Sequence, residues 1–151
     1  MALKGELLRS SLELVLERQP AITKQFYEIL FVRYPQVRPL FGRNSARAQE
    51  QMLQEAIVAV VDHVEDAAWL TSTLGALGQK HVDYGVTPAM YDWVADSLIA
   101  TLAEIAGSDW TPALQAAWSE ALLAIRDLML AGAAEAARAP QSAPATTSGA
   151  A

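Results

Sequence analysis

The sequence predicts an all-helical protein, on three observations. Apolar residues recur at helical spacing along the chain, and no segment carries a credible strand pattern. Two pairs, Thr87-Pro88 and Thr111-Pro112, place a capping hydroxyl before a proline that suits the first turn of a helix. With 151 residues, 52% of them hydrophobic, the chain can bury one core. We therefore expect one helical domain over residues 1–135 and a flexible Ala/Pro/Ser/Thr tail over residues 136–151.

The helical elements follow from apolar spacing and from residues that start or stop helices. In order, they are expected at residues 4–19, 21–33, one short turn between Pro35 and Pro39, 44–65, 66–84, and two helices that begin at Pro88 and Pro112. Asn44 or Ser45 supplies the N-cap of the long helix. Gly75 and Gly78 are expected to interrupt the helix over residues 66–84, and Gly85 to stop it.

Composition excludes several classes of function. The chain has no cysteine, which removes disulfides, thiolate-ligated metals and iron–sulfur clusters. The formal net charge is −6 and no run of Lys or Arg occurs, so we expect no nucleic-acid partner and no anionic membrane surface. No apolar run is long enough to cross a bilayer, and the first residues lack a signal-peptide pattern. We expect a soluble, cytoplasmic protein.

Two histidines are the first candidates for chemistry. His63 falls near the end of the long helix among Asp62, Glu65 and Asp66, which is typical of a surface or helix-end histidine. His81 lies at the end of the glycine-marked helix. Its position alone leaves a structural role and a metal-ligand role both open.

Motifs around Tyr27, Gln49 and His81 resemble one known family. The segment Gln79-Lys80-His81-x-x-Tyr84-x-Val86-x-Pro88-x-x-Tyr91 is similar to the proximal segment of bacterial globins of the flavohaemoglobin type. Phe26-Tyr27-x-x-Leu30-Phe31 with Leu40-Phe41 resembles that family's second and third helices, and Gln49-x-x-x-Leu53 resembles its distal helix. Gln49 and His81 are 32 residues apart, as in the family. The resemblance runs from about Leu7 to Met129 and implies a globin fold.

The resemblance also implies a non-covalent haem b and a role for each matching residue. His81 would bind the iron, Phe41 would stack on the haem, and Tyr27, Gln49 and Leu53 would face the bound gas. Further haem contacts are expected at Phe31, Leu53, Lys80, Tyr91, Val94 and Leu98. A hydrogen bond from Tyr27 or Gln49 to a ligand in a dry pocket is worth roughly 1–3 kcal/mol.

Purely structural roles for these residues also stay open. Tyr27 could be an ordinary buried tyrosine, and Gln49 could be an exposed residue like Gln51 or Gln54. Phe31, Phe41, Val94 and Leu98 could be plain core, and Lys80 reaches a haem propionate or stays in water.

One position departs from the family. There a tyrosine and a glutamate behind the histidine strengthen its donor character. Tyr91 matches the tyrosine, but the glutamate position falls on Ala133, with Glu135 two residues away. We therefore expect simple gas binding to be favoured over oxygen activation.

The resemblance implies haem-dependent, reversible binding of O2, NO and CO, for oxygen transport or storage. The alternative is NO dioxygenase activity with an external reductase, because the chain carries no glycine-rich dinucleotide fingerprint. A gas sensor and a haem-free structural module are the other hypotheses. A monomer or a weak homodimer is expected.

Overall fold

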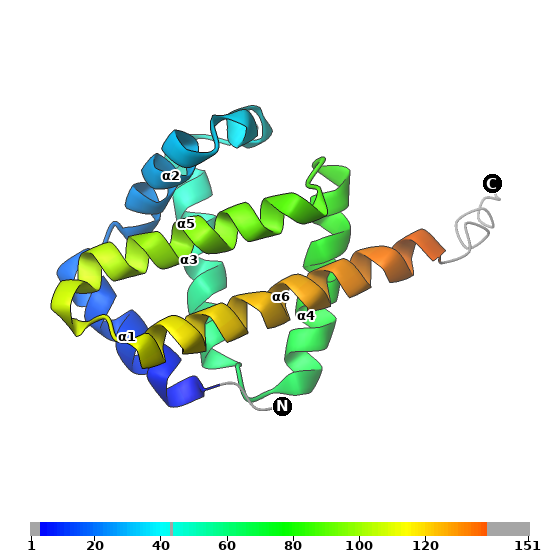
Figure 1. The fold of residues 1–151 in the computed structure, drawn as a ribbon. Coiled ribbons are helices and arrows are strands. Elements are labelled where there is room, and N and C mark those ends of the chain that lie inside the picture. The colour runs from blue at the N-terminus through cyan, green and yellow to red at the C-terminus, as the bar shows by residue number, and fades with distance from the viewer. Residues whose placement is uncertain (1–3, 43, 139–151) are drawn as a thin grey trace, which may run out of the picture.

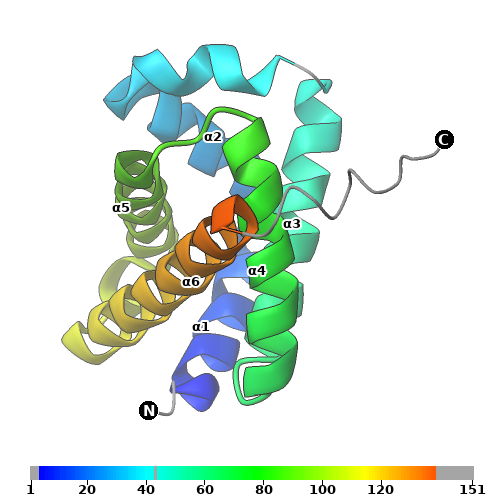
Figure 2. The ribbon, with the colours of Figure 1, turned by 90° about the vertical axis from the view of Figure 1, so that its right-hand side faces the viewer.

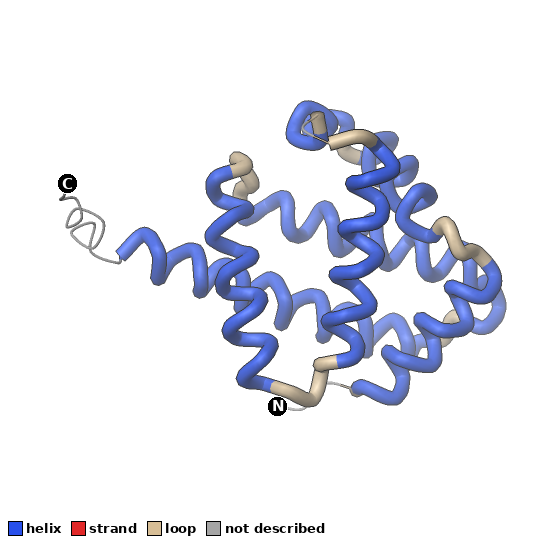
Figure 3. Tube along the Cα trace, turned by 180° about the vertical axis from the view of Figure 1, so that it is seen from behind, coloured by secondary structure: helices blue, strands red, loops and turns tan. Residues whose placement is uncertain are grey.

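The computed structural model describes residues 4–42 and 44–138, and every regular element in these ranges is helical (Figure 1). Figure 3 shows the same helices from behind, joined by short loops. The elements are α1 (Gly5–Arg18), α2 (Ile22–Arg33), the 3-10 helix η1 (Pro35–Phe41), α3 (Ala46–Asp62), α4 (Ala67–Asp83), α5 (Pro88–Ala106), the 3-10 turn η2 (Gly107–Asp109) and α6 (Pro112–Arg138). The predicted all-helical fold is confirmed.

Helix starts follow the capping residues that the sequence indicates. Ser45 Oγ accepts a hydrogen bond from the Ala48 N–H at 3.1 Å and so begins α3. α5 and α6 begin at Pro88 and Pro112, as predicted. The end of α3 was predicted too late, at residue 65. The helix ends at Asp62, and Asp66 then caps α4 by accepting a hydrogen bond from the Trp69 N–H at 3.0 Å.

The prediction that two glycines interrupt α4 is wrong. α4 is continuous across Gly75 and Gly78, and it ends before Gly85, whose φ is +89°. The glycines instead let α4 and α6 approach backbone to backbone. A Cβ on Gly78 would lie 2.0 Å from the Met129 carbonyl oxygen, and a Cβ on Gly132 would lie 2.3 Å from Gly75. The close packing of α4 on α6 therefore requires glycine at this crossing, and the glycines do not interrupt α4.

The core is divided into two clusters of unequal size. The larger one joins α1, α2, α5 and α6 around Phe26, Leu102 and Trp118. Inside it the Trp118 indole N–H donates to Ser11 Oγ at 2.9 Å. The smaller cluster, around Leu74 and its neighbours, belongs to α4 and α6, which cross in Figure 2. α3 packs on α1 and α2, whereas α4 packs chiefly on α6.

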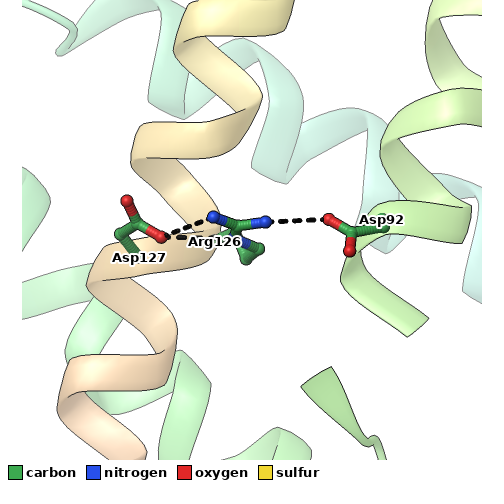
Figure 4. Close-up of polar contacts among 3 residues, drawn as sticks. All are labelled: Asp92, Arg126 and Asp127. Atoms are coloured by element: carbon green, nitrogen blue, oxygen red, sulfur yellow. Dashed lines mark hydrogen bonds and ion pairs between the residues drawn. The ribbon is translucent and has the colours of Figure 1, made fainter. Parts of the chain in front are cut away.

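Exposed ion pairs connect helices at the surface. Arg126 on α6 contacts Asp92 on α5 at 3.0 Å and its own neighbour Asp127 at 3.1 Å (Figure 4). Arg18 on α1 pairs with Asp109 and donates to the Ala106 carbonyl at the end of α5 at 2.7 Å. Because these groups are exposed to water, the ion pairs contribute little to stability.

The predicted tail overlaps the last helix slightly. α6 continues through residues 136–138, and residues 139–151 lie outside the described part of the chain. The domain boundary at residue 135 stays a prediction. Within the described ranges, no helix combines the length and the apolar character that crossing a membrane requires.

Candidate functional site

Tyr27 and Gln49 meet between α2 and α3. The Gln49 Nε2–H donates to the Tyr27 hydroxyl oxygen at 3.0 Å. Tyr27 is 8% exposed, and burial raises its pKa, while the hydrogen bond from Gln49 opposes the rise. The phenol therefore stays protonated at neutral pH. Because its oxygen accepts the Gln49 hydrogen, its own hydrogen is available for a third atom.

An aromatic cluster adjoins this pair. The ring centroids of Tyr27 and Phe41 are 5.3 Å apart, those of Tyr27 and Phe31 are 5.8 Å apart, and those of Phe31 and Phe41 are 5.6 Å apart. η1, which holds two prolines, turns the chain so that Phe41 comes back toward α2. Leu53 on α3 is half-buried against the same core. The structure thus brings Tyr27 together with Gln49, Phe31 and Phe41, and the distal role of these residues and of Leu53 stays a prediction.

His81 occupies the last turn of α4. Its Nδ1 lies 2.9 Å from the Leu77 carbonyl oxygen, and a carbonyl only accepts, so Nδ1 carries the hydrogen. Burial lowers the pKa of His81, and the bond to the Leu77 carbonyl partly opposes this. At neutral pH the ring is uncharged, with a lone pair on Nε2. This is the form that binds a metal.

The surroundings of His81 match the departure seen in the sequence. The Tyr91 ring on α5 lies 6.2 Å from the imidazole at an interplanar angle of 24°. Burial raises the pKa of Tyr91. Glu135 is exposed and Ala133 is half-buried. The hydrogen-bond partner of His81 Nδ1 is a main-chain carbonyl and not a carboxylate. The imidazole is therefore uncharged, and its Nε2 can donate an electron pair to a metal.

The other predicted haem contacts are Val94, Leu98 and Lys80. Val94 on α5 is half-buried in the larger cluster, Leu98 is 5% exposed, and Lys80 is exposed. Contact between these three residues and haem stays a prediction.

The sequence left two details of the histidines unspecified: the contacts of His63 and the hydrogen-bond partner of His81. His63 caps the end of α3 and stacks on Trp69 at 3.9 Å, which confirms the helix-end prediction. Sequence reasoning missed the Leu77 carbonyl as the partner of His81. The signal was available, because Leu77 is four residues earlier on the same helix.

Comparison with known proteins identifies the class. Residues 24–129 match the globin family, and the chain belongs to that family. Its relatives include the flavohaemoproteins of Vibrio cholerae, 30% identical over 117 residues, and of Bordetella pertussis, 29% identical over 126 residues. These matches cover 76% and 82% of this chain but 30% and 31% of the relatives. The chain thus spans about a third of the length of the curated relatives it matches.

Solved structures show the same fold. An engineered carbene transferase from Rhodothermus marinus, provisionally assigned as a nitric oxide dioxygenase, superposes with a TM-score of 0.77 at 25% identity. That match covers 91% of this chain and 96% of the other. A bacterial globin from Campylobacter jejuni gives a TM-score of 0.75 at 21% identity, covering 88% and 96%.

The residues present fit the haem that globins and flavohaemoproteins bind. His81 offers a neutral imidazole nitrogen. The rings of Phe31 and Phe41, 5.6 Å apart beside Tyr27, offer apolar surface of the kind on which a flat macrocycle can pack.

Proposed function

We propose that this chain binds haem b non-covalently, with His81 Nε2 as the protein ligand, and binds O2, NO and CO reversibly. The observation that supports it most is the His81 Nδ1–H bond to the Leu77 carbonyl, which leaves Nε2 aimed away from its own helix backbone as an unprotonated donor. When bound, haem would supply an iron with one open coordination position for a diatomic gas.

The distal residues would discriminate between gases. Tyr27 holds its proton, and Gln49 orients the hydroxyl from 3.0 Å. A hydroxyl held in place by a neighbour loses less freedom when it donates to a ligand. The phenol therefore favours a ligand that accepts a hydrogen bond over one that does not, and the Phe31 and Phe41 rings pack beside the phenol ring.

Oxygen binding, for transport or storage, is the preferred function because of the proximal side. A main-chain carbonyl withdraws the Nδ1 hydrogen of His81 less than a carboxylate would, so His81 pushes less electron density toward a metal. This favours release of an intact gas molecule over its chemical activation.

NO dioxygenation is the second candidate. The likeness to flavohaemoproteins and to the Rhodothermus marinus protein favours it. It would depend on an external reductase. Rapid NO consumption with such a reductase would favour this function, and slow NO consumption with easy O2 release would favour the carrier. The proposal further includes a cytoplasmic location and a monomer or weak homodimer.

The test is the absorption spectrum of the purified protein mixed with haem, in ferric, ferrous and CO-bound forms. His81→Ala should lose stable haem retention and the Soret band of the bound cofactor. His63→Ala is the matched control, since it removes the other histidine of the chain. It should retain normal haem content. Equal haem content in both variants, with helicity unchanged by circular dichroism, would remove His81 as the ligand.

A further inference from the structure

α2 begins without a capping side chain. Its N-cap residue is Ala21, whose methyl group accepts no hydrogen bond, and no acidic residue lies in the first turn of the helix. In the part of the chain that the structure describes, the first three main-chain N–H groups of α2, at positions 22–24, donate to no acceptor. Alanine is a poor N-cap, and free N–H groups give the start of a helix a partial positive charge. This end of α2 therefore offers hydrogen-bond donors to an acceptor from outside the chain.

A hollow of about 420 Å³ opens beside this end of α2, and Thr23 lines it. Thr23 is only 2% exposed, and its hydroxyl makes no hydrogen bond with any residue in the ranges 4–42 and 44–138. In these ranges the fully enclosed, unpaired side-chain oxygen is Ser97 Oγ, so the Thr23 hydroxyl keeps its small open surface toward the hollow. A nearly buried hydroxyl without a partner indicates a place for a polar group that the chain itself does not supply.

The α3 side of the hollow carries charges of both signs. Arg47 is exposed and forms no ion pair with a described residue, while Glu50 and Glu55 bring two carboxylates. Gln51 Nε2–H donates to the Glu55 carboxylate at 3.2 Å, and the half-buried Gln54 amide makes no hydrogen bond within the described ranges. These residues recur at spacings of three and four positions, so α3 presents them on one side.

This distribution of charge selects the ligand. A simple anion would suit Arg47 and the start of α2, but two carboxylates in the same lining would repel it. A simple cation would suit the carboxylates, but Arg47 and the positive end of α2 would repel it. A molecule that carries one group of each charge can satisfy both ends of the hollow. The volume lies in the range of roughly 300–1,000 Å³ that is typical of small-molecule sites.

We propose that this hollow binds a small zwitterion, a free amino acid with an uncharged polar side chain. Its carboxylate would accept hydrogen bonds from the Thr23 hydroxyl and the free N–H groups of α2, and would pair with Arg47. Its ammonium group would pair with the carboxylates of α3. The Gln54 amide, which can both donate and accept, would bind the polar side chain of the ligand. The proposal does not depend on haem or on gas binding.

Calorimetric titration of the full-length protein with L-glutamine is the first test. Few contacts in an open hollow predict a Kd on the order of 1 mM. Two matched probes each remove one charge: N-acetyl-L-glutamine keeps the carboxylate alone, and L-glutamine α-amide keeps the ammonium group alone. Each should bind at least roughly tenfold more weakly than L-glutamine. Equal binding of either probe would overturn the zwitterion, and so would the lack of binding of L-glutamine, L-asparagine and L-serine up to about 20 mM.

Three variants assign the binding to this hollow. Thr23→Val keeps the shape of the side chain and removes the hydroxyl, and Arg47→Gln removes an exposed charge; each should weaken L-glutamine binding roughly tenfold. Ala21→Asp adds a capping carboxylate at an exposed position, so it should raise the urea midpoint and compete with the ligand. Arg38→Gln is the matched control, because this exposed arginine lies outside the lining, and it should bind as the unmodified protein does.

Unchanged affinity in both Arg47→Gln and Ala21→Asp would overturn the proposed site. Equal weakening in Arg38→Gln and Arg47→Gln would overturn it as well, because general surface charge would then explain the binding. Circular dichroism checks that each variant keeps its helices.

Discussion

Gly78→Ala is a direct test of the crossing that positions His81. The added Cβ would lie 2.0 Å from the Met129 carbonyl oxygen, whereas ordinary van der Waals contact begins at 3.4 Å. The two helices must therefore separate by up to 3.4 − 2.0 = 1.4 Å. No rotamer change can relieve the contact, because the atom that is struck belongs to the backbone.

The expected cost follows from two opposing effects. Overpacking of this kind costs about 1–3 kcal/mol. Alanine is a better helix former than glycine by about 1 kcal/mol, which offsets part of it. Since the clash is with backbone, we expect Gly78→Ala to lose about 1–2 kcal/mol of unfolding free energy, or roughly 2–8 °C in Tm. His81 follows three residues later on α4, so haem retention should weaken as well.

Gly75→Ala is the matched control on the same helix. A Cβ there would meet its nearest neighbour, the Gly132 Cα, at an ordinary 3.7 Å. This variant should be neutral or more stable by up to about 1 kcal/mol. Urea unfolding of the haem-free proteins, followed by circular dichroism, compares the three chains. A Gly78→Ala protein as stable as the unmodified one, or more stable than Gly75→Ala, would refute the reasoning.

Three other substitutions test single groups. Ser97 Oγ is buried without a hydrogen-bond partner in the described part of the chain, so Ser97→Ala should raise the free energy of unfolding in urea by about 1 kcal/mol, and a lower value would contradict this. Tyr27→Phe should speed O2 dissociation roughly 5- to 150-fold, and an unchanged off-rate in stopped flow would show that Tyr27 is not the donor. Burial lowers the pKa of His81 from its ordinary 6.5, so the stability that its neutral ring contributes to the haem-free protein is present above that pH and is lost as the pH falls below it. His81→Leu should flatten the pH dependence of unfolding in this window; parallel curves would contradict the assignment.

Helix boundaries were predictable where a few neighbouring residues determine them. A capping side chain and the residues of the first turn are neighbours in sequence, so a helix start can be recognised locally. The helices begin where this predicts, after Ser45, Thr87 and Thr111. The role of Gly78 was not predictable. A glycine that breaks a helix and one that admits a neighbouring backbone look alike in sequence, and only the position of Met129 on α6 decides between them.

The candidate site could be predicted mainly from the resemblance to bacterial globins of the flavohaemoglobin type, and much less from the spacing of residues alone. Three glutamines lie close together on α3, and sequence alone did not decide which one faces Tyr27. The structure places Gln49 beside Tyr27, while Gln51 donates to Glu55 on the outer surface. Helix rotation, which depends on packing against α2, makes this selection. The carbonyl partner of His81 depends equally on the ring orientation, which no residue pattern specifies.

The way α4 is attached has a consequence for loading. This helix packs chiefly on α6, and its apolar cluster is separate from the larger core. An element fastened on one side can open while the rest stays folded, and its amide hydrogens should exchange with solvent sooner than those of α5. Opening of α4 alone would let haem enter without unfolding of the other helices. On the proposed assignment of His81 as the iron ligand, haem binding would in turn hold α4 against the rest of the fold and slow this exchange.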